Sequence, residues 1–268
     1  MAGLIVLVGA GNMGGAMLSG WLKNGVEPSS ILVIDPGAND VAKARFADAG
    51  VQHVVEAPSD VKAALLFLAV KPQIMAAALP SLKALVGDET VVVSVAAGKT
   101  LAFMETHLGS AAMVRAMPNT PAMVGRGVTG AYANTLVTDA QRARVHDLLK
   151  VSGPVEWVAS ESDIDAVTAV SGSGPAYVFY LVECMAEAGR KAGLPADLAM
   201  RLARATVAGA GELLHQSPDD AATLRKNVTS PGGTTAAALA VLMAEDGIQP
   251  IFDVAVAAAK QRAEELAS

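Results

Sequence analysis

A glycine-rich turn near the start of the chain has the residue types and spacing of a phosphate-binding loop. Residues 9–14 read GAGNMG, which matches the pattern G-x-G-x-x-G, and they follow the apolar run Gly3–Val8. In such a turn the first glycine permits the tight bend, the second lets the backbone approach a pyrophosphate, and the third allows the following helix to pack on the strand. A plain connection between a strand and a helix is the alternative. We predict that a dinucleotide is bound by Gly9, Ala10, Gly11, Asn12, Met13 and Gly14.

An acidic residue, Asp35, ends the second apolar run, Ile31–Asp35. It lies about 20 residues beyond Gly14, which is where an acidic side chain binds the ribose 2′-hydroxyl of a dinucleotide. A carboxylate at this position would repel a 2′-phosphate, so Asp35 taken alone favours NADH over NADPH. The alternative is that Asp35, which precedes Pro36 and Gly37, serves only as a turn residue.

Three further loops follow expected strands, at the edge where a doubly wound sheet binds its ligands. They are residues 69–72, which read AVKP, residues 94–98, and residues 117–121, which read MPNTP. Asn119 is a candidate to hydrogen-bond the nicotinamide or the substrate. We interpret Lys71 as a solvated or phosphate-facing lysine rather than as a catalytic base. The cofactor is expected to contact Ala69, Val70, Lys71, Pro72, Ala96 and Asn119.

The second half of the chain contains two glycine-rich loops, residues 171–175 (SGSGP) and residues 230–235 (SPGGTT), each directly before an apolar helix. Backbone N–H groups in such loops, together with the hydroxyl groups, form a concave site for a small anion such as a carboxylate. Ordinary helix caps are the alternative, because serine and threonine are good capping residues.

Other catalytic arrangements do not emerge from the sequence. The histidines His53, His107, His146 and His215 lack partners at metal-ligand spacing, so no metal is expected. Neither a Ser-His-Asp arrangement nor paired loop carboxylates are found. Oxidation of an alcohol needs a base to remove the hydroxyl proton. A protonated imine instead accepts hydride once it is positioned, so the loops suit an imine carboxylate.

The framework that positions these loops is indicated by alternating strand and helix signals in the first half of the chain. This alternation predicts an α/β fold with a doubly wound parallel sheet, covered by helices on both faces and built with right-handed crossovers. The expected strands are 3–8, 31–35, 65–70, 90–96 and 112–117, with weaker signals at 128–133 and 155–159.

From about Asp163 onward the chain shows helical patterns and no convincing strand. We therefore predict a dinucleotide-binding domain over residues 1–160 and an all-helical domain over residues 161–268. Helices rich in Ala, Leu and Val have too few polar residues to solvate a wide face, so we expect this domain to pack against a second copy of the chain. The expected helices include 175–193, 195–216, 235–244 and 250–267.

Composition narrows the classes of function. Hydrophobic residues make up 52% of the 268 residues, and the net charge of −6 gives no basic face for nucleic acid. The first residues lack the basic segment of a signal peptide, and no apolar run approaches the roughly 20 residues that span a bilayer. A protein without membrane segments, located in the cytoplasm, is the expectation. Cys184 lies in an apolar helical stretch and is expected to be buried.

Five motifs, taken together and in order, resemble the pyrroline-5-carboxylate reductase family. They are GAGNMG at 9–14, AVKP at 69–72, MPNTP at 117–121, SGSGPAY at 171–177 and SPGGTT at 230–235, and the last two are the specific ones. The resemblance implies a Rossmann-type domain followed by a helical dimerisation domain, in dimers that commonly assemble into decamers. It also implies reduction of 1-pyrroline-5-carboxylate to proline, the last step of proline biosynthesis, by NADPH or NADH.

The resemblance further implies roles for individual residues. The loop resembling 230–235 binds the substrate carboxylate through backbone N–H groups, and the threonine matching Thr235 contacts the ring nitrogen, so Thr235 is expected to be the catalytic residue. NADPH-using relatives often have a small polar residue where Asp35 stands, so the family favours NADPH where Asp35 favours NADH. Substrate contacts are expected from Ser171, Ser173, Gly174, Ser230, Gly232, Gly233, Thr234 and Asn119.

Two other interpretations stay open. β-Hydroxyacid dehydrogenases also join a dinucleotide-binding start to a helical domain, but they place a lysine about one helical turn beyond a glycine-rich segment. Here Gly174 is followed by PAYVFYLVE, which contains no lysine. A protein that senses dinucleotide without catalysis would bind the cofactor and leave the imine unreduced. Retention of the 230–235 loop argues against that interpretation.

Overall fold

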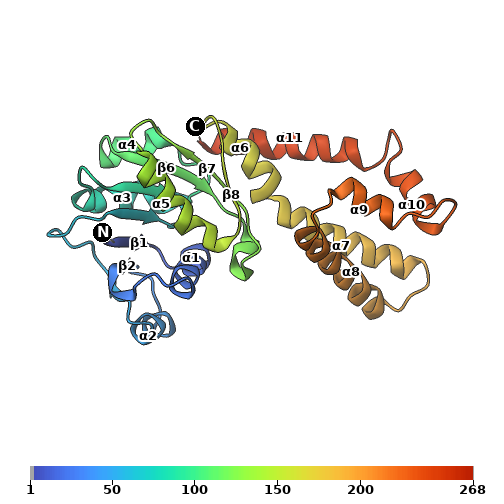
Figure 1. Ribbon diagram of the computed structural model, residues 1–268, viewed down its shortest axis with the longest axis horizontal. Coiled ribbons are helices and arrows are strands. Elements are labelled where there is room, and N and C mark those ends of the chain that lie inside the picture. Colours follow the sequence, from blue (N-terminus) through green and yellow to red (C-terminus); the bar gives the residue numbers. More distant parts are fainter. Residues whose placement is uncertain (1–2, 268) are drawn as a thin grey trace. The chain divides into compact units, whose positions relative to one another are not determined.

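The apolar runs of the first half form one eight-stranded sheet. The computed structural model of the chain describes residues 3–267, and its strands follow the order β3-β2-β1-β4-β5-β6-β7-β8 (Figure 1). The part of this order from β3 to β6 is that of dinucleotide-binding doubly wound folds, which confirms the predicted fold class. The strands are β1 (Ile5–Val8), β2 (Ile31–Ile34), β3 (Gln52–Val54), β4 (Leu65–Leu68), β5 (Val91–Ser94), β6 (Ala112–Met117), β7 (Thr129–Ala133) and β8 (Val155–Trp157).

The sheet is parallel except at one junction. Strand β7 pairs with β6 in the antiparallel direction, with Arg115 opposite Tyr132, and β8 then pairs with β7 in parallel. A tight return from β6 is possible because the 3-10 turn Thr120–Val124 and the left-handed Gly125 reverse the chain directly after that strand. The parallel strands β1 to β6 therefore end at a common edge, and β7 starts from it.

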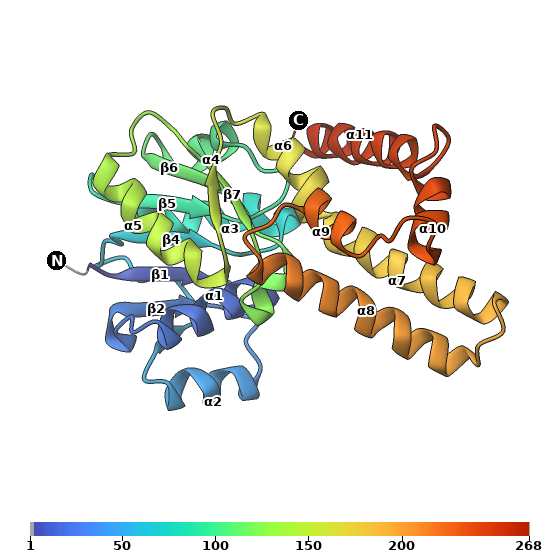
Figure 2. The same ribbon diagram turned by 45° about the vertical axis from the view of Figure 1, so that its right-hand side comes forward.

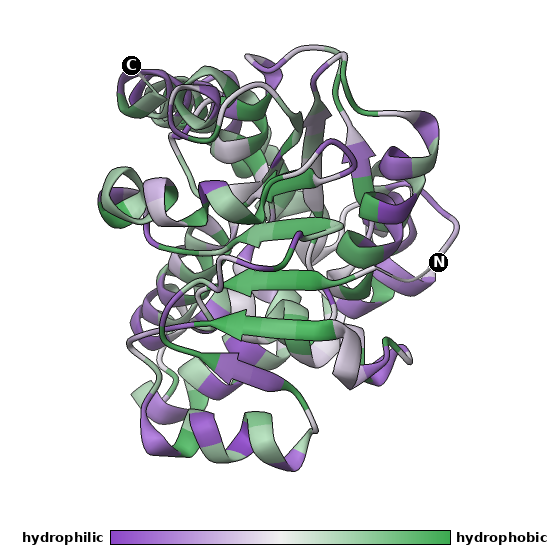
Figure 3. Cartoon of the chain, turned by 90° about the vertical axis from the view of Figure 1, so that its left-hand side faces the viewer, coloured by the Kyte–Doolittle hydropathy of each residue, from purple (hydrophilic) through white to green (hydrophobic). Residues whose placement is uncertain are grey.

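Helices cover both faces of the sheet, which explains why the central strands read as continuous apolar runs. Successive side chains of a strand point to opposite faces. One face packs against α1 (Asn12–Lys23), α2 (Asp40–Asp48) and α5 (Asp139–Leu149). The other packs against α3 (Met75–Leu82) and α4 (Leu101–Leu108). Figure 3 shows the central strands as a hydrophobic layer, with hydrophilic residues gathered on the helices around them.

The rest of the chain is helical. A π-helical turn, Thr168–Gly172, joins the first two of its helices. These helices are α6 (Asp163–Val167), α7 (Gly174–Lys191), α8 (Ala196–Gln216), α9 (Ala221–Asn227), α10 (Thr234–Leu242) and α11 (Ile248–Ala267).

Packing divides the chain into two compact units. Unit 1 contains the residues up to Gly172 and those from Ala259 onward, and unit 2 is Ser173–Ala258. Helix α6 belongs to unit 1 because it packs on β6 and β7. The boundary between the two compact units therefore lies at Ser173. The predicted boundary between the dinucleotide-binding and the helical domain, at residue 160, remains a prediction.

Unit 2 buries little of its own surface. Helices α7 and α8 form an antiparallel pair (Figure 2). Across Ser173–Ala258, all of which is described, the buried residues are just three alanines, Ala186, Ala199 and Ala203. Cys184 is exposed on α7, so the expectation that it is buried is wrong for a single copy. Other residues of unit 2 do not cover the Cys184 side chain.

Candidate active site

The three glycines of the first turn have the geometry that dinucleotide binding requires. Gly9 adopts a φ of 86°, which side chains rarely allow, and a Cβ there would lie 2.9 Å from the carbonyl oxygen of Ala69. A Cβ on Gly14 would collide with the carbonyl oxygen of Gly9, so the helix can approach the strand only without it. A Cβ on Gly11 would meet nothing within 4 Å. The open space at Gly11 is where a pyrophosphate would approach the backbone.

We expect Gly11→Ala to weaken dinucleotide binding about tenfold, because its methyl group would occupy the space of the pyrophosphate. The melting temperature should stay close to that of the wild type, since the methyl group has no protein atom to displace. Fluorescence titration with NADH and NADPH measures the first quantity, and thermal unfolding measures the second. Gly209→Ala is a matched control, because Gly209 also has open space around it but lies inside α8. An unchanged Kd in Gly11→Ala would remove this turn from the cofactor site.

Asp35 binds the glycine turn directly. Its Oδ2 accepts the backbone N–H of Ala10 at 2.8 Å, and its Oδ1 accepts the N–H of Gly37 at 2.9 Å. The side chain thus ties the end of β2 to the phosphate-binding turn and closes its own turn. Each carboxylate oxygen has a second lone pair, so these two bonds leave acceptor capacity for a ribose hydroxyl.

The predicted rim residues lie at the ends of β4 and β5, as expected for parallel strands that end at one edge. Ala69, Val70 and Pro72 are half-buried, and Lys71 is exposed. Ala96 is buried and packs in the core under α4, so only its backbone is positioned to meet a ligand. A Cβ on the neighbouring Gly98 would lie 2.9 Å from Leu266 near the end of α11, which shows that the C-terminal turn packs on this loop.

Asn119 brings two predicted site segments together within unit 1. Its Oδ1 accepts the N–H of Val128 at 3.0 Å, and its Nδ2 donates to the carbonyl oxygen of Ser171 at 3.2 Å. The residue is only 9% exposed. These bonds use the amide oxygen and one of its two N–H donors. The structure therefore gives Asn119 a part in loop positioning, while a direct contact with the ligand stays a prediction.

In unit 2 the loop before α10 forms a tight turn. The N–H of Gly233 donates to the carbonyl oxygen of Ser230 at 3.0 Å, and Gly232 has a φ of 67°. This is the position at which a turn with proline before it demands glycine. Helix α10 then starts at Thr234, and Thr235 is half-buried in its first turn. Since Gly233 donates within the turn, a carboxylate would be held by the neighbouring N–H groups.

Helices α7 and α10 begin without a side-chain hydrogen bond to their first N–H groups, as far as the described residues show. Ser173 and Gly233 occupy the two capping positions. By contrast, α4 and α9 are capped by Thr100 and Asp220. In the described structure the first-turn N–H groups of α10 are therefore available to an anion, which favours the ligand interpretation of the loop before α10 over ordinary capping. In α7 the second residue is Pro175, which has no N–H, and the N–H of Ala176 donates to the carbonyl oxygen of Ser173 at 3.0 Å, so this helix start does not separate the two interpretations. Helices α6 and α8 also lack side-chain caps but follow no glycine-rich motif.

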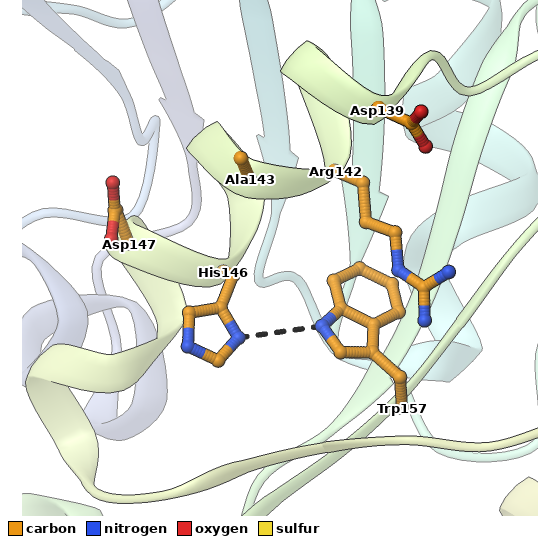
Figure 4. Close-up of a pocket in the computed structure, with 6 residues that line it drawn as sticks. All are labelled: Asp139, Arg142, Ala143, His146, Asp147 and Trp157. Atoms are coloured by element: carbon orange, nitrogen blue, oxygen red, sulfur yellow. Dashed lines mark hydrogen bonds between the residues drawn. The ribbon is translucent and has the colours of Figure 1, made fainter.

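A separate surface hollow of about 370 Å³ lies between α5 and β8 (Figure 4). The Arg142 guanidinium lies 4.5 Å from the ring centroid of Trp157, and the Trp157 indole N–H donates to Nδ1 of His146 at 3.3 Å. The hollow contains none of the predicted site residues, so the candidate active site is elsewhere. Its lining residues are Asp139, Arg142, Ala143, His146, Asp147 and Trp157.

Three charged residues near the rim were not singled out from the sequence, namely Arg115, Glu161 and Asp165. Arg115 is buried in β6 and forms ion pairs with the carboxylates of Glu161 and Asp165. The sequence feature that could have indicated this cluster is an arginine inside an otherwise apolar strand. A charged side chain in such a strand is buried and needs a partner of opposite charge. Within residues 3–267 no group of three or more His, Cys, Asp or Glu side chains could hold a metal, and no helix is long and apolar enough to cross a membrane.

Comparisons with known proteins agree on one family. Residues 161–266 match the family model described as pyrroline-5-carboxylate reductase dimerisation, and residues 4–98 match the model described as NADP oxidoreductase coenzyme F420-dependent. The chain is 42% identical over 266 residues to a pyrroline-5-carboxylate reductase of Pseudomonas aeruginosa, and the match covers 98% of this chain and 96% of that relative.

Solved structures give the same answer. The fold is similar to a pyrroline-5-carboxylate reductase from Coxiella burnetii, with a TM-score of 0.92, 34% identity and 100% of both chains covered. It is also similar to a Plasmodium falciparum pyrroline carboxylate reductase solved with NADP bound, with a TM-score of 0.80, 27% identity, and 99% of this chain and 98% of that chain covered. The chain therefore belongs to the pyrroline-5-carboxylate reductase family and is an NAD(P)H-dependent oxidoreductase that acts on a carbon–nitrogen double bond.

Proposed function

We propose that the loops described above share the reduction of 1-pyrroline-5-carboxylate to L-proline, the last step of proline biosynthesis. The observation that carries this assignment is the glycine-rich loop in front of α10, whose first N–H groups lack a side-chain cap in the described structure, together with the second glycine-rich loop in front of α7. A helix start of this kind binds a carboxylate, and the substrate carries one beside its imine. A β-hydroxyacid carries a carboxylate too, so the choice of an imine over a hydroxyacid rests on the residues after Gly174, PAYVFYLVE, which contain no lysine to act as the base.

Each loop has its own task in this proposal. Bound NAD(P)H supplies the hydride, which moves to the imine carbon. The N–H groups of Gly232 and Thr234 hold the carboxylate, with Ser171, Ser173, Gly174 and Ser230 around the substrate. The Thr235 hydroxyl hydrogen-bonds the ring nitrogen, which keeps its proton as the C=N π electrons become the nitrogen lone pair. Hydride transfer then needs no separate catalytic acid, because the proton that charges the iminium is already on the nitrogen and stays on the product amine.

The remaining cofactor contacts belong to unit 1. Gly9, Gly11 and Gly14 shape the turn for the pyrophosphate, with Ala10, Asn12 and Met13 between them. The backbone at Ala69, Val70, Pro72 and Ala96 borders the nicotinamide, together with Asn119. Lys71 is exposed at the same rim and is suited to a phosphate contact.

Cofactor preference depends on Asp35, and we expect NADH to be preferred. A carboxylate next to a 2′-phosphate is repelled by it, whereas it can accept a hydrogen bond from the free 2′-hydroxyl. Asp35→Asn removes the charge and keeps one side-chain oxygen for the N–H of Ala10. It should shift the ratio of kcat/KM for NADPH over NADH upward by about tenfold. A ratio that stays constant would mean that Asp35 only supports the turn.

The activity is tested by following cofactor absorbance with 1-pyrroline-5-carboxylate as substrate, with NADH and NADPH run side by side. Turnover that depends on the imine supports the proposal. Folded protein that binds dinucleotide but oxidises neither cofactor would favour a sensing role. Turnover with a β-hydroxyacid instead of the imine would favour the dehydrogenase interpretation.

Assembly and location are also part of the proposal. The dimerisation domain shows that this family forms oligomers through the helical part of the chain, and assembly of its dimers into a decamer is our proposal here. Light scattering of the purified protein distinguishes a dimer from a decamer. A cytoplasmic location likewise stays a prediction, which fractionation of the source cells would test.

A further inference from the structure

A buried arginine lies directly beneath the rim of the candidate site. Arg115 is in β6, is 3% exposed, and forms an ion pair from Nη2 to Oδ1 of Asp165 at 2.9 Å. Its Nη1 lies 3.5 Å from Oε1 of Glu161. Asp165 is itself buried, in α6, so both members of the shorter pair are removed from water. One guanidinium fork thus contacts two carboxylates that are one helical turn apart in the chain.

Glu161 extends this network to a third segment. Its Oε1 also accepts the backbone N–H of Leu101 at 2.7 Å, and Leu101 is the first residue of α4. Thr100 caps the same helix start through its side chain. The network of Arg115, Glu161 and Asp165, called the rim network below, therefore joins β6, the start of α4 and α6.

Each of these three segments leads into a loop of the candidate site. Strand β6 continues into Asn119, the start of α4 ends the loop that contains Ala96, and α6 continues into the turn that contains Ser171. The Ser171 carbonyl oxygen accepts a hydrogen bond from Asn119, so the loop after β6 and the turn after α6 are also bonded to each other. The rim network touches none of the predicted ligand-binding residues through its side chains.

Packing around α6 leaves little freedom for these loops to shift independently. A Cβ on Gly130 of β7 would lie 2.5 Å from Cγ1 of Val167, so α6 rests directly on the strand backbone. A Cβ on Gly172 would lie 2.7 Å from Cε of Met117. A displacement of α6 is passed on to the Ser171 turn, because α6 continues directly into it, and Met117 at the end of β6 lies against the same turn.

We propose that the rim network is a positioning device for the reduction, which fixes the loop of Ala96, Asn119 and the Ser171 turn in one arrangement. The inference rests on the proposed function. A buried ion pair gains little net stability over an apolar replacement, because desolvation of the charges offsets their attraction. Its geometric effect is larger, because the guanidinium fork fixes two carboxylates in direction as well as in distance. Arg115, Glu161 and Asp165 are therefore positioning residues rather than catalytic ones.

Asp165→Asn and Glu161→Ala test this role. Asp165→Asn keeps the size of the side chain and removes its charge, and Glu161→Ala removes the acceptor for Leu101. Both should lower kcat by about tenfold to a hundredfold, since a small misplacement of reacting groups is costly. The Kd for NAD(P)H without substrate should change by less than about threefold, a small free-energy difference, because the pyrophosphate turn at Gly11 lies outside the network. Glu161→Gln, which keeps the side-chain oxygen, should restore most of kcat.

Thr90→Val is the matched control for a loss of stability. Thr90 is buried at the opposite end of β5, where its hydroxyl donates to Ala63 and accepts from Gly87. It should lower the melting temperature and leave kcat of the folded enzyme unchanged. Gly130→Ala is a second perturbation that displaces α6 without touching a charge, and it should reproduce the loss of kcat.

The outcomes separate the two proposals. Wild-type protein that binds NAD(P)H but does not reduce the imine would contradict the proposed function. Active wild type, with network variants that lose melting temperature as Thr90→Val does and keep kcat, would overturn the positioning role. A loss of kcat in Glu161→Ala that Glu161→Gln does not restore would also overturn it.

Discussion

Thr235→Ala is expected to lower kcat about a hundredfold, the order of loss found when one hydrogen-bond donor to the transition state is removed, because the Thr235 hydroxyl can donate to the lone pair that develops on the ring nitrogen. Binding of NAD(P)H should be retained, because the glycine turn proposed to hold the pyrophosphate is in unit 1 and Thr235 is in unit 2. The folded structure should also be retained. Thr235 occupies the first turn of α10, where alanine is well tolerated. Steady-state kinetics with 1-pyrroline-5-carboxylate and a cofactor titration measure the two quantities.

Two variants show whether the hydroxyl itself is responsible. Thr235→Ser keeps the hydroxyl and should keep kcat within about threefold, if one hydrogen bond carries the effect. Thr106→Ala removes a threonine hydroxyl that bonds only to its own helix, at the carbonyl oxygen of Ala102, and should leave the kinetics unchanged. Turnover in Thr235→Ala equal to that of the wild type would rule out polarisation of the imine by this residue.

The second large effect is expected at the surface of unit 2. Three buried alanines cannot offset the conformational entropy of ordering Ser173–Ala258, so this unit should fold only together with a second copy. Phe179 is 63% exposed on α7 and Ile251 is 65% exposed on α11. Phe179→Glu forfeits about 2 kcal/mol of apolar burial in each copy, and twofold symmetry doubles the loss. The dimer Kd should rise about a thousandfold.

Analytical ultracentrifugation measures this dissociation, and far-UV circular dichroism should show loss of helix on dilution. Ile251→Glu is expected to act in the same way. Val41→Glu is the control, because Val41 is equally exposed but lies on α2 of unit 1. A Phe179→Glu protein that stays dimeric would place Phe179 outside the interface, and a folded monomer with full helix content would show that unit 2 is stable without its partner.

The sequence predicted the strands well where both faces of the strand are buried, because such strands are continuous apolar runs. The runs 31–35, 65–70 and 112–117 are apolar apart from Asp35 and Arg115, and they form β2, β4 and β6 with small differences at their ends. The helices expected over 175–193 and 195–216 form α7 and α8 with small differences at their ends, because a proline opens each of them. The positions of the glycine-rich loops followed directly from these elements.

Other elements could not be predicted because tertiary contacts decide them. Strand β3 has only the three residues Gln52–Val54, with a polar and a histidine side chain, and it forms because β2 offers an unpaired edge. Helix α5 carries many charged residues and few apolar ones, so its sequence gives a weak amphipathic pattern. Val145, Leu148 and Leu149 are nevertheless buried against the sheet. The antiparallel direction of β7 depends on the turn at Gly125, which strand patterns do not reveal.

The same distinction applies to the site. Glycine spacing predicted the turn at residues 9–14, because the conformation of such a turn depends on where glycine stands in the local sequence. The internal bonds of Asn119 to Val128 and Ser171 were not predictable, since they join residues far apart in the chain. The rim network escaped prediction for the same reason. Its three charges lie in segments whose proximity only the folded sheet determines.

Transfer of deuterium tests the central claim most directly. The enzyme would be incubated with 1-pyrroline-5-carboxylate and NADH or NADPH deuterated at C4 on either face, and the product analysed by mass spectrometry and NMR. Hydride transfer to the imine carbon predicts L-proline with deuterium on the ring carbon that adjoins nitrogen and does not bear the carboxylate, from only one of the two C4 faces of the cofactor. Proline without deuterium from either labelled cofactor, or no proline from protein that binds the cofactor, would contradict it.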